Sequence, residues 1–359
     1  MFGYDIQFAL RSKFHARLRH HPIRKEADMI LTIDIGGTRT RLAMVDEDAP
    51  EIRLEHFRSY RSEAYRDVDE VIQDYETSIG IKAERAVIGV PGPVLEGSAR
   101  ATNLPWKLEE KRLADKLCFS SVKLINDVEA LGYAIDVLSS DDLIMLNPGR
   151  HTPEAPAAVI APGTGLGEAY VLPTASGYRV FPSEGGHAGF SPSNKLELKL
   201  LEYLMANHDH VSVETVCSGP GICNIYRFLR DRKICIEPRW LKEALEKSAD
   251  QAGTIAQNAL SEDRTEAISI QALDLFVAIL GTAAGNLALT LAAKKGVVIG
   301  GGIAPQILPF LQKDLFMQSF LNKGPLSHFV ADVPVSVIRK PEANLYGLAN
   351  FARKRQQAR

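Results

Sequence analysis

The pattern of apolar and polar positions predicts several strands that begin near residue 30. Ile30, Leu31, Ile33 and Ile35 are apolar and mostly β-branched, as a buried strand requires. A glycine pair follows, and apolar extended chain then resumes. The expected elements are three antiparallel strands, a helix, two strands and a helix, at residues 30–35, 38–45, 51–59, 62–78, 85–90, 122–127 and 128–138.

The second half of the chain repeats this opening. A strand at 157–161 leads into a glycine turn and further strands, and helical spacing fills most of 219–295. The other expected elements are strands at 168–172, 178–181, 297–299 and 334–338, and helices at 195–205 and 343–355. Strand, glycine turn and strand therefore open each half, although no sequence period is visible. The order is that of a ribonuclease-H-like α/β unit, present twice, with a cleft expected between the two units.

Domain boundaries follow from this duplication. We expect a small α/β domain at 29–138 plus 339–359 and a large α/β domain at 139–338. Residues 1–28 are rich in arginine, lysine and histidine and lack the apolar core of a secretory signal. Met29 directly precedes the first strand. We therefore expect residues 1–28 to be a disordered extension or a product of start-codon choice.

Composition narrows the possible partners. The 359-residue chain is 45% hydrophobic and 24% charged, with a formal net charge of -2, which gives no electrostatic case for nucleic acid or an anionic membrane. No apolar run is expected to cross a bilayer. Four cysteines occur without a C-x-x-C pair, so neither a zinc site nor a disulfide framework is indicated. Reduced thiols favour a reducing compartment, and we expect a cytoplasmic protein.

The first glycine turn is the segment around which the chain is organised. Gly36, Gly37 and Thr38 can point several backbone N–H groups at one anion, in a turn that residues without a Cβ adopt cheaply. Asp34 directly before the turn would repel a bare phosphate, so the pair indicates a Mg²⁺-nucleotide. An ordinary β-hairpin with an aspartate at its turn is the alternative.

Two further glycine turns follow strands. Gly163, Thr164 and Gly165 open the second turn, which suits close approach of backbone to phosphate. Its spacing is not that of a dinucleotide-binding loop, and a P-loop pattern occurs nowhere in the chain. Gly301 and Gly302 form the third turn, with a helix expected next, and could let a flat heterocycle lie on backbone. A plain hairpin turn and close helix–strand packing are the respective alternatives.

Polar residues near strand ends and loops are candidates for substrate chemistry. Asp127, after Asn126, could accept a proton from a hydroxyl group, or it could cap the helix that follows. Glu184 and His187 lie on a glycine-rich loop, where hydrogen bonding to vicinal hydroxyls is favoured over metal binding. Glu214 and Asn103 are weaker candidates, since each would usually be a surface or turn residue.

Taken in order, these motifs resemble those of the bacterial-type glucokinases. The ordered set is Asp34–Arg41, Ile125–Asp127, Gly163–Gly167, Glu184–His187, Glu214 with Ser218–Gly221, and Gly301–Ile303, and the resemblance covers residues 29–351. It implies membership of the hexokinase, actin and heat-shock ATPase superfamily, with two actin-like domains. No cysteine-rich zinc motif follows His187, unlike in the related ROK glucokinases, so a non-ROK enzyme is expected.

The resemblance also implies a role for each candidate. Asp127 matches the base that deprotonates the sugar 6-hydroxyl. The positions that match glucose ligands are Asn103, Asp127, Glu184, His187 and Glu214. Those that match phosphate and adenosine contacts are Gly36, Gly37, Thr38, Gly163, Thr164, Gly165, Gly301 and Gly302. Asp34 matches the position near Mg²⁺, reached through water. ATP, Mg²⁺, glucose and a homodimer are therefore expected. A kinase of another hexose, an ADP or polyphosphate donor, and a non-catalytic sugar sensor stay open.

Overall fold

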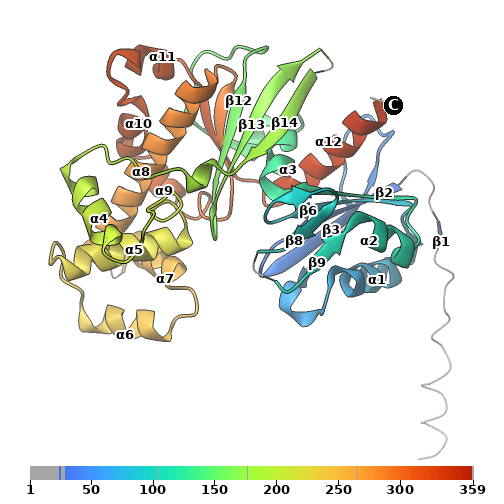
Figure 1. Cartoon of the computed structure of the whole chain (residues 1–359), viewed down its shortest axis with the longest axis horizontal. Helices are drawn as coiled ribbons and strands as arrows, with labels where there is room; N and C mark the ends of the chain where they lie inside the picture. The colour runs from blue at the N-terminus through green and yellow to red at the C-terminus, as the bar shows by residue number, and fades with distance from the viewer. Residues whose placement is uncertain (1–23, 26–28, 103, 176, 264, 358–359) are drawn as a thin grey trace, which may run out of the picture.

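Two mixed β-sheets form the framework of the molecule (Figure 1). The computed structural model describes residues 24–25, 29–102, 104–175, 177–263 and 265–357. The first sheet has the strand order β10-β6-β2-β3-β4. These strands are β10 (Ser121–Asn126), β6 (Arg85–Val90), β2 (Met29–Ile35), β3 (Arg39–Asp46) and β4 (Glu55–Arg61). The hairpin of β2 and β3 is antiparallel, whereas β6 and β10 run parallel to β2.

The second sheet repeats the first and adds an edge strand. Its order is β11-β16-β15-β12-β13-β14. The strands are β11 (Leu143–Asn147), β16 (Val335–Ile338), β15 (Gly296–Ile299), β12 (Ala157–Pro162), β13 (Leu166–Thr174) and β14 (Gly177–Ser183). Without β11, its order and strand directions match those of the first sheet, with β12 in the place of β2. The internal duplication expected from the sequence is therefore confirmed.

Helices cover both sheets and also lie between them. Helices α1 (Val68–Ile79) and α2 (Glu110–Leu117) pack on the outer face of the first sheet. Helices α3 (Asp127–Ala134) and α12 (Ala343–Gln357) pack against each other, and their apolar residues join one core with both sheets (Figure 1). Helix α8 (Ala267–Leu291) covers the outer face of the second sheet. The remaining helices of that half are α4 (Lys195–Met205), α5 (Gly219–Asp231), α6 (Arg239–Lys247), α7 (Gln251–Leu260), α9 (Leu308–Leu311), α10 (Asp314–Leu321) and α11 (Ser327–Ala331).

Helix α8 corrects one expectation from composition. It has 25 residues and contains a strongly apolar window, so by length and composition it could cross a membrane, contrary to the prediction that no apolar run is long enough. In the structure, 61% of its apolar window is buried inside the protein. A core helix of a large α/β protein meets the same test because both of its faces are covered.

Several element boundaries also differ from the predictions. The helix expected at 62–78 begins at Val68, because the Asp67 side chain accepts a hydrogen bond from the Glu70 N–H and caps it. After the third glycine turn the chain makes further turns, and α9 spans only Leu308–Leu311. Helix α2 and the small sheet of β7 (Val94–Leu95), β8 (Ser98–Arg100) and β9 (Lys107–Glu109) were not predicted. Within the N-terminal extension, β1 (Arg24–Lys25) pairs with β5 (Ile81–Lys82), and the rest lies outside the described residues.

Candidate active site

Asp34 is held in place from two directions at the end of β2. One carboxylate oxygen, Oδ2, accepts a hydrogen bond from Arg41 Nη1 at 3.2 Å across the β2–β3 hairpin. The other, Oδ1, accepts one from Asn344 Nδ2 at 2.9 Å, at the start of α12. Asp34 is buried, so these contacts fix its carboxylate in a defined orientation. Neither partner was predicted from the sequence.

The first glycine turn is closed by its own backbone and by Ser62. The Gly36 N–H donates to the Arg39 carbonyl at 3.0 Å, and Ser62 Oγ donates to the Gly36 carbonyl at 2.7 Å. Gly36 does not adopt a left-handed φ, so the conformational reason expected for this glycine was wrong. A Cβ there would lie 2.8 Å from the Arg39 carbonyl oxygen, which is a steric reason instead. Gly37 and Thr38 are exposed at the tip of the turn.

Helix α3 begins directly at the candidate base. The Asn126 side-chain oxygen accepts hydrogen bonds from the Val128 and Glu129 N–H groups at 2.9 and 3.1 Å, and so caps the helix. Asn126 Nδ2 also donates to the Gly92 carbonyl at 3.1 Å. Asp127 is the first residue of the helix, and its Oδ1 accepts from the Val128 N–H at 2.9 Å. The cap is therefore Asn126, and the alternative that Asp127 serves as the N-cap is wrong.

Three carboxylates from separate elements form one electrostatic group. Burial raises the pKa of Asp127 to about 7, and the neighbouring negative charges of Asp34 and Glu184 add to the increase. Asp34 ends β2, Asp127 begins α3, and Glu184 follows β14. The two halves of the molecule thus contribute to the same site. Carboxylates brought together in this way suit a general base and the neighbourhood of a cation.

The second glycine turn contacts Glu214. The Gly163 N–H donates to the Gly165 carbonyl at 2.8 Å and closes the turn. Glu214 Oε2 accepts a hydrogen bond from the Leu166 N–H at 2.8 Å, and a Cβ on Gly165 would lie only 2.5 Å from the same oxygen. A side chain at 165 would therefore displace the Glu214 carboxylate from this position. Thr164 is exposed at the tip of the turn.

Helix α5 begins beside the same turn. The Gly219 N–H donates to the Gly163 carbonyl at 2.8 Å. Ser218 caps α5, since its Oγ accepts from the Gly221 N–H at 3.1 Å and donates to the Glu214 carbonyl at 2.7 Å. The positive end of a 13-residue helix therefore lies next to the second glycine turn. A helix N-terminus near a glycine turn favours a phosphate group there.

The third glycine turn lies alongside the second. Gly301 has a φ of +79°, and a Cβ there would overlap the Pro162 carbonyl oxygen at the end of β12. The Ile303 N–H donates to the same carbonyl at 3.3 Å. Gly302 is exposed, and a Cβ on it would meet nothing within 4 Å. Gly301 is thus needed for the fold, whereas Gly302 faces open space in which a ligand could lie.

Glu184 and His187 lie on an exposed loop that Glu214 ties to the second turn. The His187 N–H donates to the Glu184 carbonyl at 3.0 Å and closes a 3₁₀ turn at Gly185–His187. The Glu214 N–H donates to the Gly186 carbonyl at 2.9 Å. Both side chains are exposed and available to a ligand. Asn103 lies outside the described residues, so the structure does not place it.

The candidate residues gather in two connected groups. Asp34, Asp127 and Glu184 share one electrostatic environment, and the second and third glycine turns flank Pro162 with Glu214 beside them.

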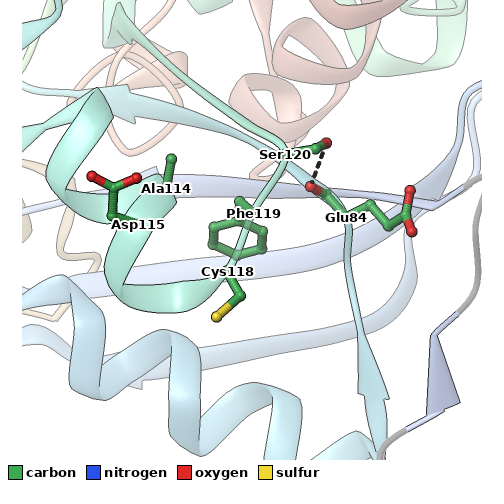
Figure 2. A pocket seen from close by; sticks show the side chains of 6 residues that line it. All are labelled: Glu84, Ala114, Asp115, Cys118, Phe119 and Ser120. Atoms are coloured by element: carbon green, nitrogen blue, oxygen red, sulfur yellow. Dashed lines mark hydrogen bonds between the residues drawn. The ribbon is translucent and has the colours of Figure 1, made fainter.

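A surface cavity of about 390 Å³ lies elsewhere, near the end of α2 (Figure 2). Its lining residues, all drawn in Figure 2, are Glu84, Ala114, Asp115, Cys118, Phe119 and Ser120. None of them is a candidate site residue, so this cavity is separate from the candidate active site.

Comparison with solved structures gives the class of protein. A glucokinase from an Antarctic psychrotroph has 32% sequence identity and a TM-score of 0.77, covering 91% of this chain and 99% of its own. A ROK family glucokinase from Streptomyces griseus, solved with glucose and AMPPNP, has 17% identity and a TM-score of 0.61, covering 91% of this chain and 99% of its own. The fold is that of the sugar kinases with actin-like ATPase architecture, as expected.

Sequence comparison gives the family within that class. The family model described as Glucokinase matches residues 31–355. A glucokinase from Nostoc sp. is 41% identical over 336 residues, which cover 89% of this chain and 98% of the relative. The chain belongs to the glucokinase family. The prediction of a glucokinase that phosphorylates glucose with ATP is confirmed.

Proposed function

We propose that Asp127 is the general base when this glucokinase transfers the γ-phosphoryl group of ATP to the 6-hydroxyl of D-glucose. The observation that carries this assignment is the position of Asp127. Its carboxyl group is at the start of α3, close to Asp34 and Glu184, and has a pKa raised to about 7. A base with a pKa near the working pH accepts a proton most effectively as the hydroxyl attacks. Asp127 acts late, when the hydroxyl proton becomes acidic.

The three glycine turns would hold the nucleotide. The tips at Gly37–Thr38 and Thr164 are exposed, and the N-terminus of α5 adds its positive end beside the second turn. The open face of Gly302 suits the adenosine side of the nucleotide. Backbone N–H groups bind phosphate whatever base the nucleotide carries. ATP is the donor that the family indicates, and the assay below compares it with ADP and polyphosphate.

Mg²⁺ would be held near Asp34, through water. Both oxygens of Asp34 already accept hydrogen bonds from Arg41 and Asn344, so direct coordination would displace a partner, whereas a water-mediated contact would not. Among the described residues, no group of three or more histidine, cysteine or acidic side chains could hold a metal ion alone. Mg²⁺ is commonly bound by one or two carboxylates together with the phosphate oxygens of the substrate, so a single aspartate is sufficient on the protein side. When bound, it would neutralise charge on the phosphates.

The sugar would bind to carboxylates and a histidine around Asp127. Glu184 and His187 present exposed polar groups on one loop, and Glu214 has one oxygen, Oε2, occupied by the Leu166 N–H. Its other oxygen would accept a sugar hydroxyl. Asn103 is proposed as a further ligand from its match to the family. Charged acceptors for vicinal hydroxyls give strong and directional hydrogen bonds.

We further propose that the two α/β units, 29–138 plus 339–359 and 139–338, close on the substrates and expel water. Water would otherwise compete with the 6-hydroxyl as nucleophile. Helix α3 contacts strands of both sheets, so it could transmit such a movement. A non-ROK enzyme, a homodimer and a cytoplasmic location are proposed from the family and from the four free cysteines.

A coupled assay for glucose 6-phosphate with Mg-ATP tests the proposal. Mannose, fructose and N-acetylglucosamine are run beside glucose, and ADP and polyphosphate beside ATP. Glucose-dependent product with ATP is the expected result. Faster turnover of another hexose would change the substrate assignment. No product with any pair, together with heat stabilisation by glucose, would make the protein a sugar sensor.

A further inference from the structure

Glu168 is a buried carboxylate for which the proposed reaction has no role. It lies on β13 opposite Ser183 of β14. Side chains of a strand alternate between faces, so Glu168 shares its face with Leu166 and Tyr170, which pack into the apolar core beneath the second sheet. Glu168 is 8% exposed. An acidic side chain at a core-facing strand position is unusual unless it has a specific role.

No group compensates this carboxylate. Among the described residues, no hydrogen bond or ion pair is made by the Glu168 side chain. Burial raises its pKa to about 7, and burial is the single cause of the increase. The side chain is therefore largely neutral at slightly acid pH, and above neutral pH it becomes a mostly buried charge with no cationic partner among the described side chains.

The position of Glu168 connects it to the loop that carries Glu184 and His187. Glu168 Oε2 lies so close to Gly185 that a Cβ on this glycine would overlap it. The Gly185 N–H donates to Ser183 Oγ at 3.0 Å, and Ser183 Oγ donates to the Tyr170 hydroxyl at 3.2 Å. The backbone between Glu184 and His187 therefore rests directly on the Glu168 side chain.

We propose that Glu168 is a positioning residue of the sugar site, whose side chain under Gly185 holds the 184–187 loop in the conformation that presents Glu184 and His187. This inference rests on the proposed sugar site. The neutral carboxyl group fills the space under the loop. Its ionised form draws water around the carboxylate, and this loosens the contact between the side chain and the Gly185 backbone. Glucose affinity therefore falls as pH rises above 7.

The ionisable groups near Glu168 do not contribute to the shift of its pKa. The ionisable groups on the segments around it are Tyr170, Tyr178, Arg179, Glu184, His187, Glu214 and Cys217. None of them shifts the Glu168 pKa, which burial alone raises. Burial raises the pKa of Cys217, and the Glu168 charge adds to that increase, so the thiol stays neutral throughout.

Glucose affinity, measured by calorimetry at pH 6.5 and 8.5, tests the inference. Wild type should bind glucose about threefold or more weakly at pH 8.5, the upper limit being tenfold per pH unit above the pKa. Glu168→Gln keeps the size of the side chain without its charge, so it should lose the part of this pH dependence that Glu168 causes. Asp127 titrates in both proteins, so their difference isolates Glu168. Glu168→Ala should bind glucose weakly at both pH values, with KM for ATP unchanged.

Glu76 supplies a matched control. It is a buried glutamate on α1 with a pKa that burial also raises to about 7, and it lies in the other half of the fold. Glu76→Gln and Glu76→Ala should leave glucose affinity and its pH dependence as in wild type. The inference is overturned if Glu168→Gln keeps the full pH dependence, or if Glu168→Ala binds glucose normally. Failure of wild type to bind glucose at all would instead refute the proposed function.

Discussion

Asn126 caps helix α3 and thereby leaves the adjacent Asp127 without that structural duty. The Asn126 oxygen accepts hydrogen bonds from two N–H groups of the first turn, at 2.9 and 3.1 Å. No side chain among the described residues donates to Asp127, whose carboxylate accepts from backbone N–H groups, including that of Val128. A carboxylate without a side-chain partner, at the end of a strand and the start of a helix, can accept a hydrogen bond from a substrate hydroxyl. The Asn126 side chain caps α3 in the same way whether Asp127 is protonated or ionised.

Replacement of the base should separate turnover from sugar binding. Asp127→Asn is expected to lower kcat by about 100-fold or more, because the amide cannot accept the proton, while glucose affinity changes little because it can still hydrogen-bond the hydroxyl. The coupled assay and calorimetry with glucose measure the two effects. Helix α3 should survive because its cap is Asn126. Turnover within roughly tenfold of wild type would refute the assignment of the base.

The pKa of Asp127 should determine how the reaction rate changes on the acid side of the pH–rate profile. Its pKa is raised to about 7, so the base is protonated and inactive below that pH and ionised above it. The kcat measured at saturating glucose should therefore rise with pH and level off above neutrality. Asp34→Asn removes one of the negative charges that raise this pKa, so it should move the midpoint to lower pH. An unchanged midpoint would show that the two carboxylates do not interact, whatever the level of activity.

Local patterns predicted most of the framework, because strands and glycine turns have short-range signals. The β2–β3 hairpin, its repeat at β12–β13 and the first residues of α4 all follow from periodicity within about ten residues. The pairing of Arg41 with Asp34 could have been found from the hairpin register. The Asn344 contact could not, since 310 residues separate it from Asp34 and only the packed position of α12 brings them together.

The site was harder to predict where burial decides the chemistry. The order of motifs placed Asp127, Glu184 and Glu214 near one another, but the raised pKa of Asp127 depends on how closely three separate elements approach. Glu168 has a weak signal in the sequence, an acid at a core-facing position of β13 between Leu166 and Tyr170. The sequence could not predict that the Glu168 side chain lacks a partner or that it contacts Gly185, because both depend on the packed structure. The strand period gives the face of a residue but not its neighbours across the core.

Glu184 should contribute to sugar affinity more than to stability. Glu184→Gln replaces a charged acceptor by a neutral one at an exposed position, so the fold should be unaffected. Glucose affinity should fall by about tenfold, since hydrogen bonds to charged groups are worth roughly 1.5–3 kcal/mol. Calorimetry with glucose measures the change, and Glu154→Gln, on an exposed loop, serves as the control. Equal glucose affinity in both variants would count against a sugar contact at Glu184.

The third glycine turn offers a test of nucleotide binding in which two neighbouring residues should behave differently. Gly301→Ala forces a side chain into a φ of +79° and against the Pro162 carbonyl, which should cost about 1–3 kcal/mol of stability. Gly302→Ala adds a methyl group that meets no protein atom within 4 Å, so its Tm should match that of wild type. If adenosine lies against Gly302, this variant should nevertheless raise KM for ATP several-fold without changing glucose affinity. Thermal unfolding and the coupled assay separate the two effects, and an unchanged KM for ATP in the stable Gly302→Ala variant would place the nucleotide elsewhere.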